Sequence, residues 1–236
     1  MTTQPVTGRQ RDFVIWLDKQ IYGFSVHWLA VFSLFTFIYV GLPFAAPALM
    51  KAGLTGPANV IYTVYSPLCH QFGFRSMFLF GEKPFYEAPE FKALTGIDPY
   101  NLSDRWRAKT FSGNEAMGYK VAYCERDVAI YGGILIAGLI FGLVRVTGIK
   151  LKPLHWLAYG LIGIGPIALD GFSQLFSQPP FNFIPLREST PLLRTLTGLL
   201  FGAVNVWFAY PYVEESFAEI SAELNEKLAR VMAADE

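Results

Sequence analysis

The sequence predicts an all-α integral membrane protein. We expect a bundle of four transmembrane helices, an interfacial or re-entrant segment outside the membrane, and an amphipathic helix at the cytoplasmic C-terminus. Of the 236 residues, 53% are hydrophobic and only 16% are charged, against roughly 25% charged residues in soluble domains. Four stretches also approach the roughly 20 mostly apolar residues that a helix needs to cross a bilayer. Composition and segment length therefore agree on a multi-pass membrane protein.

The predicted transmembrane domain covers residues 27–213. Its four membrane-spanning stretches are residues 27–50, 128–144, 154–176 and 190–213. A weaker apolar segment, 57–80, is interrupted by Pro67 and has three interpretations: a short fifth span, a re-entrant piece, or a helix on the outer surface, which we favour. Residues 82–120 are polar with Pro and Gly turn signals, which predicts an external loop.

Basic residues in short loops predict the orientation, because such loops stay in the cytoplasm. The link between the second and third spans holds Arg145, Lys150 and Lys152 and no acidic residue. With four spans, both termini are then cytoplasmic and the protein is integral to the cell (inner) membrane. Residues 51–125 and 177–189 are expected outside.

The two terminal segments have separate predictions. Residues 1–26 are expected to form a cytoplasmic amphipathic segment, and residues 214–236 an acidic amphipathic helix. The apolar stripe of that helix recurs every three or four residues: Phe217, Ile220, Leu224, Leu228 and Val231. Its acidic faces argue against an anionic lipid surface, so it contacts either a protein partner or its own bundle. The balance of 19 basic and 19 acidic residues gives no sign of nucleic-acid binding, and homo-oligomerisation stays open.

Asp170 is the most unusual residue of a predicted span. It lies about 12 Å below the outer end of its helix, where a lone carboxylate costs on the order of 3 kcal/mol. Gln174 is one turn away on the same face. Arg194 lies about 8 Å deep in the fourth span, and its side chain is expected to pair with Asp170. Such a pair either fixes two helices or forms the floor of a functional pocket, to which Arg126, Arg187 and Glu188 would also contribute from the same membrane face.

Cys69, His70, Cys124 and Asp127 form a second group on the predicted outer face. Thiolate, imidazole and carboxylate are the usual zinc ligands. From the residue types alone we favour a disulfide, the usual state of two extracytoplasmic cysteines, and two free thiols are a third alternative. His27 and His155 each begin a His-Trp-Leu-Ala segment near the inner end of a span. Haem ligation by this pair is conceivable, but interfacial anchoring is the commoner role of a His-Trp pair.

Four motifs resemble, in the same order, those of an uncharacterised family of prokaryotic multi-pass membrane proteins known only as a domain of unknown function. They are PLCHQFGFRSMFLFG, YCERDVAIYGG, ALDGFSQLF and RESTPLLRTLTGLLFG, and the resemblance covers about 60 to 215. It implies a small helical membrane domain and no known activity. Many members have Cys-Ala-Arg-Cys where this chain has Cys-Glu-Arg-Asp, so Asp127 stands where a third cysteine is common. The resemblance thereby raises the prospect of metal ligation, because aspartate replaces cysteine as a ligand but not in a disulfide.

The sequence leaves enzyme and non-enzyme functions both open. One hypothesis is a metal-dependent enzyme, with zinc at the cysteine group and a lipid-linked or amphiphilic substrate. A second is a non-catalytic membrane subunit or assembly factor with a Cys69–Cys124 disulfide. A third is a small transporter that uses Asp170, which would have to dimerise because four spans are few for one chain.

Overall fold

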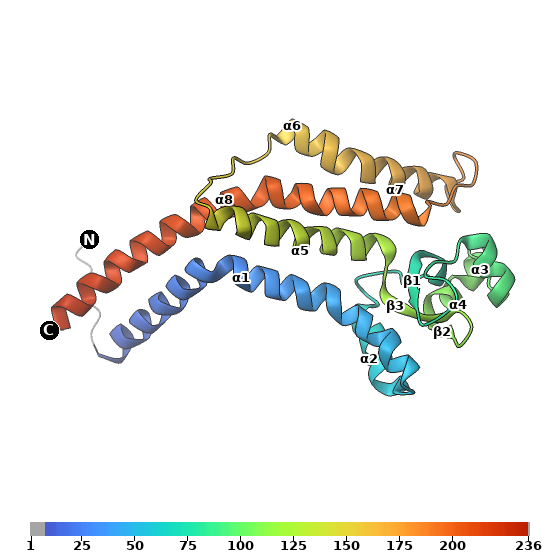
Figure 1. The fold of residues 1–236 in the computed structure, drawn as a ribbon, viewed down its shortest axis with the longest axis horizontal. Helices are drawn as coiled ribbons and strands as arrows, with labels where there is room; N and C mark the ends of the chain where they lie inside the picture. The colour runs from blue at the N-terminus through green and yellow to red at the C-terminus, as the bar shows by residue number, and fades with distance from the viewer. Residues whose placement is uncertain (1–7, 236) are drawn as a thin grey trace.

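The computed structural model describes residues 8–235 and confirms the predicted helical membrane bundle (Figure 1). Its helices include four that are long and apolar enough to cross a membrane. They are α1 (Arg9–Lys51), α5 (Glu125–Val146), a third continuous segment, and α8 (Pro191–Asp235). The third segment joins α6 (Trp156–Ala158), a π-helical stretch η3 (Tyr159–Ile164) and α7 (Gly165–Ser177). Residues 1–7 and 236, the outermost parts of the predicted terminal segments, lie outside the described residues.

The terminal segments are not separate helices. The predicted N-terminal amphipathic segment continues into the first span as α1, and the predicted C-terminal helix continues out of the fourth span as α8. Both extend beyond the bundle, and the start of α1 and the end of α8 lie at the same end of the molecule (Figure 1). An ion pair of 2.7 Å between Lys227 Nζ and Asp18 Oδ2 joins the two extensions. At their base, the indole Nε1 of Trp28 donates to Glu214 Oε2 at 2.8 Å.

Glycines set the close packing of α5 against α8. A Cβ atom added at Gly202 would lie 2.2 Å from the carbonyl oxygen of Ile130, and one at Gly133 would lie 2.7 Å from that of Leu199. Small residues at such crossings let two helix backbones approach closely, which is a main source of helix association within a membrane.

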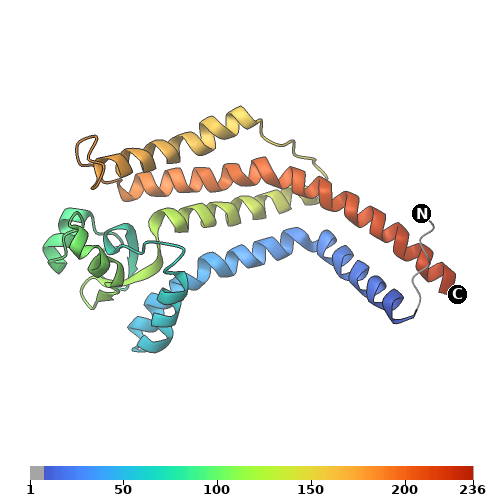
Figure 2. The ribbon, with the colours of Figure 1, turned by 180° about the vertical axis from the view of Figure 1, so that it is seen from behind.

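A small α/β unit caps the end of the bundle opposite the chain termini (Figure 2). Its antiparallel sheet has the strand order β1-β3-β2. The unit consists of α2 (Thr55–Tyr65), η1 (Gly73–Arg75), β1 (Ser76–Leu79), α3 (Ala88–Thr95), η2 (Leu102–Asp104), α4 (Arg105–Thr110), β2 (Gly113–Asn114) and β3 (Gly118–Cys124).

Residues 82–120 are therefore an ordered part of this unit and not an irregular loop. A core shared with η1 and β1 holds them, built from Phe74, Phe78, Tyr86, Phe91 and Met117 among others. Because polar residues lie between these positions, the overall composition of the segment gives no sign of a hydrophobic core. Helix α2 has 11 residues, about 16 Å of helix, and is too short for a fifth span.

Strand β3 runs into α5 without a loop. Cys124 ends the strand and is also the N-cap residue of the helix. Upstream on the same strand, Lys120 is 1% exposed. Its Nζ donates to the carbonyl oxygen of Gln71 at 2.7 Å and also to that of Lys109. Lys120 thus connects the strand to the chain beside Cys69 and to the end of α4, and burial lowers its pKa to about 7.

Substitution of Gly202 by alanine is expected to destabilise the bundle, because the new Cβ collides with the α5 backbone. Overpacking of this kind costs about 1–3 kcal/mol. Gly132 is the matched control, since a Cβ there meets no atom within 4 Å. Thermal unfolding in detergent should show a lower Tm for Gly202→Ala and an unchanged Tm for Gly132→Ala. Equal melting of the two variants would contradict the close packing.

Lys120 is expected to contribute a rise in the stability of the wild-type protein between pH 7 and about 10. Lys120 has a lower pKa in the folded state than in the unfolded chain, so the unfolded state binds more protons in this window and stability increases with pH. Lys120→Met should flatten this dependence. The substitution should also lower the free energy of unfolding by about 1–3 kcal/mol, because it leaves two buried carbonyl groups without a donor. The measurement is Tm against pH for both proteins, and identical slopes would refute the buried-lysine assignment.

Candidate functional site

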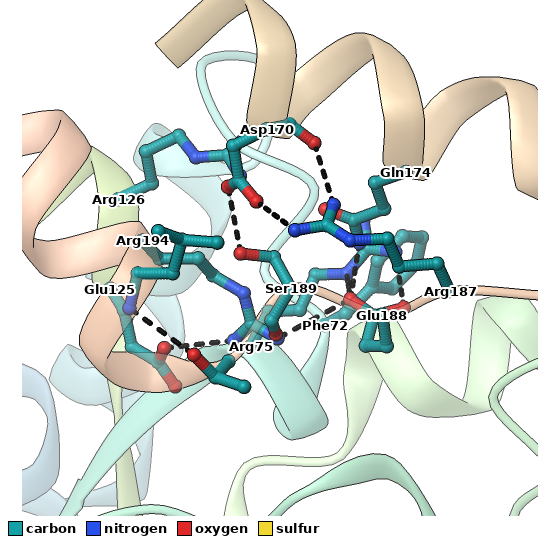
Figure 3. Close-up of polar contacts among 12 residues, drawn as sticks. Phe72, Arg75, Glu125, Arg126, Asp170, Gln174, Arg187, Glu188, Ser189 and Arg194 are labelled. Carbon is teal, nitrogen blue, oxygen red and sulfur yellow. Dashed lines mark hydrogen bonds and ion pairs between the residues drawn. The ribbon is translucent and has the colours of Figure 1, made fainter. Parts of the chain in front are cut away.

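Three carboxylates meet several arginines at the end of the bundle that carries the small unit (Figure 3). Asp170 comes from α7, Glu188 from the segment before α8, and Glu125 is the first residue of α5. All three carboxylates are paired with guanidinium groups. In so buried an environment an unpaired carboxylate would be costly, so these pairs hold the surrounding segments in one arrangement.

Asp170 is 4% exposed and accepts three side-chain hydrogen bonds. Its donors are Arg126 Nη2 at 2.5 Å, Arg187 Nη2 at 2.8 Å and Ser189 Oγ at 2.7 Å. The expected pairing with Arg194 is wrong. Depth along two helices does not fix which way each side chain points around its axis, and α5 brings Arg126 to Asp170 instead.

Glu188 is the centre of a second set of contacts. Arg75 binds it with two nitrogens, Nε at 2.8 Å and Nη2 at 3.0 Å. The amide nitrogens of Gln174 and Gln178 also donate to its carboxylate. With both oxygens occupied, Glu188 has the geometry of an anchor that joins the small unit to α7, rather than of a free general base.

Arg194 and Glu125 form the most deeply buried pair, each 3% exposed, with Nη1 of the arginine 2.8 Å from Oε2 of the glutamate. Arg194 also lies 3.3 Å from Glu188. The sequence reasoning missed Glu125, although it stands inside the Cys-Glu-Arg-Asp motif. Acidic residues are common in the first turn of a helix, so the position of Glu125 did not mark it as a site residue.

The cysteine group lies beside this network. The sulfur atoms of Cys69 and Cys124 and a carboxylate oxygen of Asp127 all lie within 4.8 Å of one another. Both cysteines are free thiols, and Cys124 Sγ donates to Asp127 Oδ2 at 3.1 Å. Two backbone N–H groups, those of Gln71 and Cys124, point at Cys69 Sγ at 3.4 and 3.3 Å. Hydrogen bonding with Cys69, together with burial, raises the pKa of the Cys124 thiol.

His70 is the predicted ligand that does not join the group. It is exposed, and its ring lies 5.5 Å from the ring of Phe72, centroid to centroid. Side chains of neighbouring residues diverge, so Cys69 and His70 face different directions. Partial desolvation and the cations Arg75 and Lys109 lower the pKa of His70.

A pocket of about 540 Å³ connects the two groups. Seven of the ten predicted site residues line it, and Asp170, Arg187 and Glu188 do not. Asp170 binds Arg126, and Glu188 binds Arg75 and Gln174, all of which line the pocket, whereas Arg187 binds Asp170 and Ser173. Three further polar lining residues were not predicted as site residues: Arg75, Arg105 and Gln178. Arg75 lies in the first motif and Gln178 one turn beyond Gln174, but no sequence signal marks Arg105, which α4 brings from the supposed loop.

The buried Arg194–Glu125 pair gives a testable prediction. Arg194→Met leaves the Glu125 carboxylate buried without a cation and should cost about 3–5 kcal/mol. Adding Glu125→Leu removes the stranded charge and should recover much of the loss. Arg230→Met is the control on the same helix, because its pair with Glu226 is exposed and worth little. Thermal unfolding of the four proteins checks this, and equal Tm values for Arg194→Met and Arg230→Met would contradict it.

Comparison with known proteins agrees with the motif resemblance. Residues 110–208 match the family described as "Predicted membrane protein (DUF2085)". A protein of Methanocaldococcus jannaschii, "Uncharacterized protein MJ1492", is 27% identical over 190 residues, which cover 78% of this chain and 91% of that protein. No solved structure matches the chain. The resemblance is thus confirmed: over residues 110–208 this chain matches a family of predicted membrane proteins of unknown function.

Proposed function

We propose that this protein is a membrane enzyme that binds a divalent metal ion, zinc, through Cys69, Cys124 and Asp127 and acts on an amphiphilic substrate in the adjoining pocket. One observation carries the proposal: two thiols and a carboxylate converge within 4.8 Å on the wall of a 540 Å³ pocket. These residues come from segments 55 positions apart in the chain, held together where β3 enters α5.

The chemistry of the three residues suits zinc. Zinc binds thiolate sulfur at about 2.3 Å and carboxylate oxygen at about 2.0–2.2 Å, so in a tetrahedral site the ligand atoms lie roughly 3.5–3.8 Å apart. A contraction of about 1 Å from the widest present separation is enough. The two backbone N–H groups on Cys69 Sγ would stabilise the negative charge of a metal-bound thiolate.

Three protein ligands and one open position are typical of catalytic zinc sites. His70 lines the same pocket but stands outside this group, so the three ligands would leave the fourth position open to water or substrate. A bound metal ion polarises a carbonyl or phosphoryl oxygen or activates water. Arg126, held by Asp170, faces the pocket and is suited to binding an anionic group of the substrate.

The two other hypotheses draw less support. A Cys69–Cys124 disulfide is compatible with the short separation of the sulfurs, but it gives Asp127 no role. A proton-coupled transporter needs a carboxylate that gains and loses a proton, whereas the Asp170 carboxylate is held by two arginines and Ser189.

Metal content tests the proposal. Protein purified without chelators should contain about one zinc ion per chain by elemental analysis. Cys69→Ser, Cys124→Ser and Asp127→Asn should each lose it, because a ligand is removed. Asp127→Cys is the matched variant that should keep it, since cysteine is an equally good zinc ligand. Glu226→Gln changes an exposed acid outside the group and should bind zinc like the wild type.

Thiol counting under denaturing, non-reducing conditions separates the alternative. Two reactive thiols per chain are expected once the metal is removed. A metal-free protein, or one with no reactive thiols and a Cys69–Cys124 bond identified by mass spectrometry, would overturn the proposal.

A further inference from the structure

We infer that the pocket is a binding site for a phosphate group, carried by an amphiphile whose apolar part leaves the pocket along α7. This inference names a ligand class for the proposed enzyme. It rests on the proposed function only for the reaction that follows binding. The argument uses the arginines of the pocket and not the cysteine group.

The pocket has more guanidinium groups than carboxylates to balance them. Four arginines line it: Arg75, Arg105, Arg126 and Arg194. With Arg187, five cations face Asp170, Glu188, Glu125 and Asp127, which leaves one positive charge without a counter-charge. Among residues 8–235, Arg105 has no carboxylate partner; its Nη2 lies 3.5 Å from the carbonyl oxygen of Pro179.

Two of these arginines have donors left over. The Nε atoms of Arg126 and Arg194 are buried and have no hydrogen-bond acceptor in the described chain. Arg194 is 3% exposed, so this donor is buried at the wall of the pocket. A buried donor without an acceptor is costly, and a shift of either side chain toward the pocket would let a bound anion supply one.

The arrangement favours a tetrahedral anion. A carboxylate presents its two oxygens in one plane, to which a single guanidinium group can bind with two nitrogens, as Arg75 binds Glu188. The pocket instead has guanidinium groups from four places: η1, α4, α5 and α8. Phosphate presents several oxygens in different directions and so accepts hydrogen bonds from several arginines at once.

The rim of the pocket indicates the rest of the ligand. Leu68, Leu175 and Phe181 line it and are each at least 40% exposed. Leu175 belongs to α7, part of a candidate membrane span whose outer face also exposes Leu169 and Phe172. A phosphate among the arginines therefore has an apolar route along α7, which suits a headgroup joined to an acyl or isoprenoid chain.

The test is binding of defined phosphates to the full chain in zwitterionic detergent, measured by calorimetry and by ³¹P line broadening. The probes are dihexanoyl phosphatidic acid, inorganic phosphate and uncharged dihexanoylglycerol. Phosphatidic acid should bind, and more tightly than inorganic phosphate. Equal affinity for both phosphates would identify free phosphate as the ligand and overturn the amphiphile part. No binding of either, or equal binding of the uncharged lipid, would overturn the inference as a whole.

Two variants report on the pocket and one serves as control. Arg105→Gln removes the cation that lacks a carboxylate partner, leaves the buried network in place, and should weaken phosphatidic acid binding about tenfold or more. Gly171→Leu adds bulk beside Arg126 Nη1, which lies 3.4 Å from where a Cβ would begin, and should block binding without changing any charge. Arg107→Gln, on the same helix as Arg105 but paired with Asp104 outside the pocket, should bind like the wild type.

The Cys124→Ser variant separates this inference from the metal proposal. Phosphate binding by a wild-type protein that contains no metal supports the anion site while the metal proposal fails on its own test. Phosphate binding that persists in Cys124→Ser, which is expected to lose the metal, supports an anion site that does not depend on the metal. Stoichiometric zinc together with no phosphate binding would overturn the anion site and leave the metal proposal standing.

Discussion

At one end of this molecule, the relative positions of the helices depend on ion pairs between buried carboxylates and arginines. Each carboxylate would be too costly to bury without its arginine. Asp170, Glu188 and Glu125 each have one or two guanidinium partners at 2.5–3.3 Å. The pairs cross between elements: α5 to α7, α5 to α8, and η1 to the segment before α8. Because removal of either member strands a charge in an environment that solvates it poorly, the network holds these elements at fixed positions.

The small α/β unit completes the pocket by contributing reactive and charged side chains at this end of the bundle. Strand β3 passes directly into α5, which fixes Cys124 beside the first turn of a membrane-spanning helix. The segment that carries Cys69 is fastened to the same strand, since the Gln71 side chain donates to the carbonyl oxygen of Ala122 at 2.9 Å and Lys120 donates to that of Gln71. The two cysteines lie close together because hydrogen bonds join strand β3 to the loop that carries Cys69. They are not neighbours on one helix.

The opposite end of the molecule is organised by different forces. Trp28, Phe141 and Val206 form an aromatic and aliphatic core between α1, α5 and α8. Glu214 accepts from Trp28 and from Arg145, 2.8 Å in each case. These contacts hold the bundle where the long extensions of α1 and α8 leave it, and they involve none of the residues of the pocket.

The sequence by itself determined the four long helices, because runs of about 20 apolar residues have few alternatives, and it identified the chemically unusual residues through their types and motifs. It did not determine their partners. Asp170 was expected beside Arg194 but lies beside Arg126 and Arg187, and Arg105 came from a segment expected to be an irregular loop. Spacing along a chain gives the depth of a residue on its own helix. Which side chain it meets depends on the rotation and order of neighbouring helices and on the fold of a distant segment, and only the tertiary structure sets these.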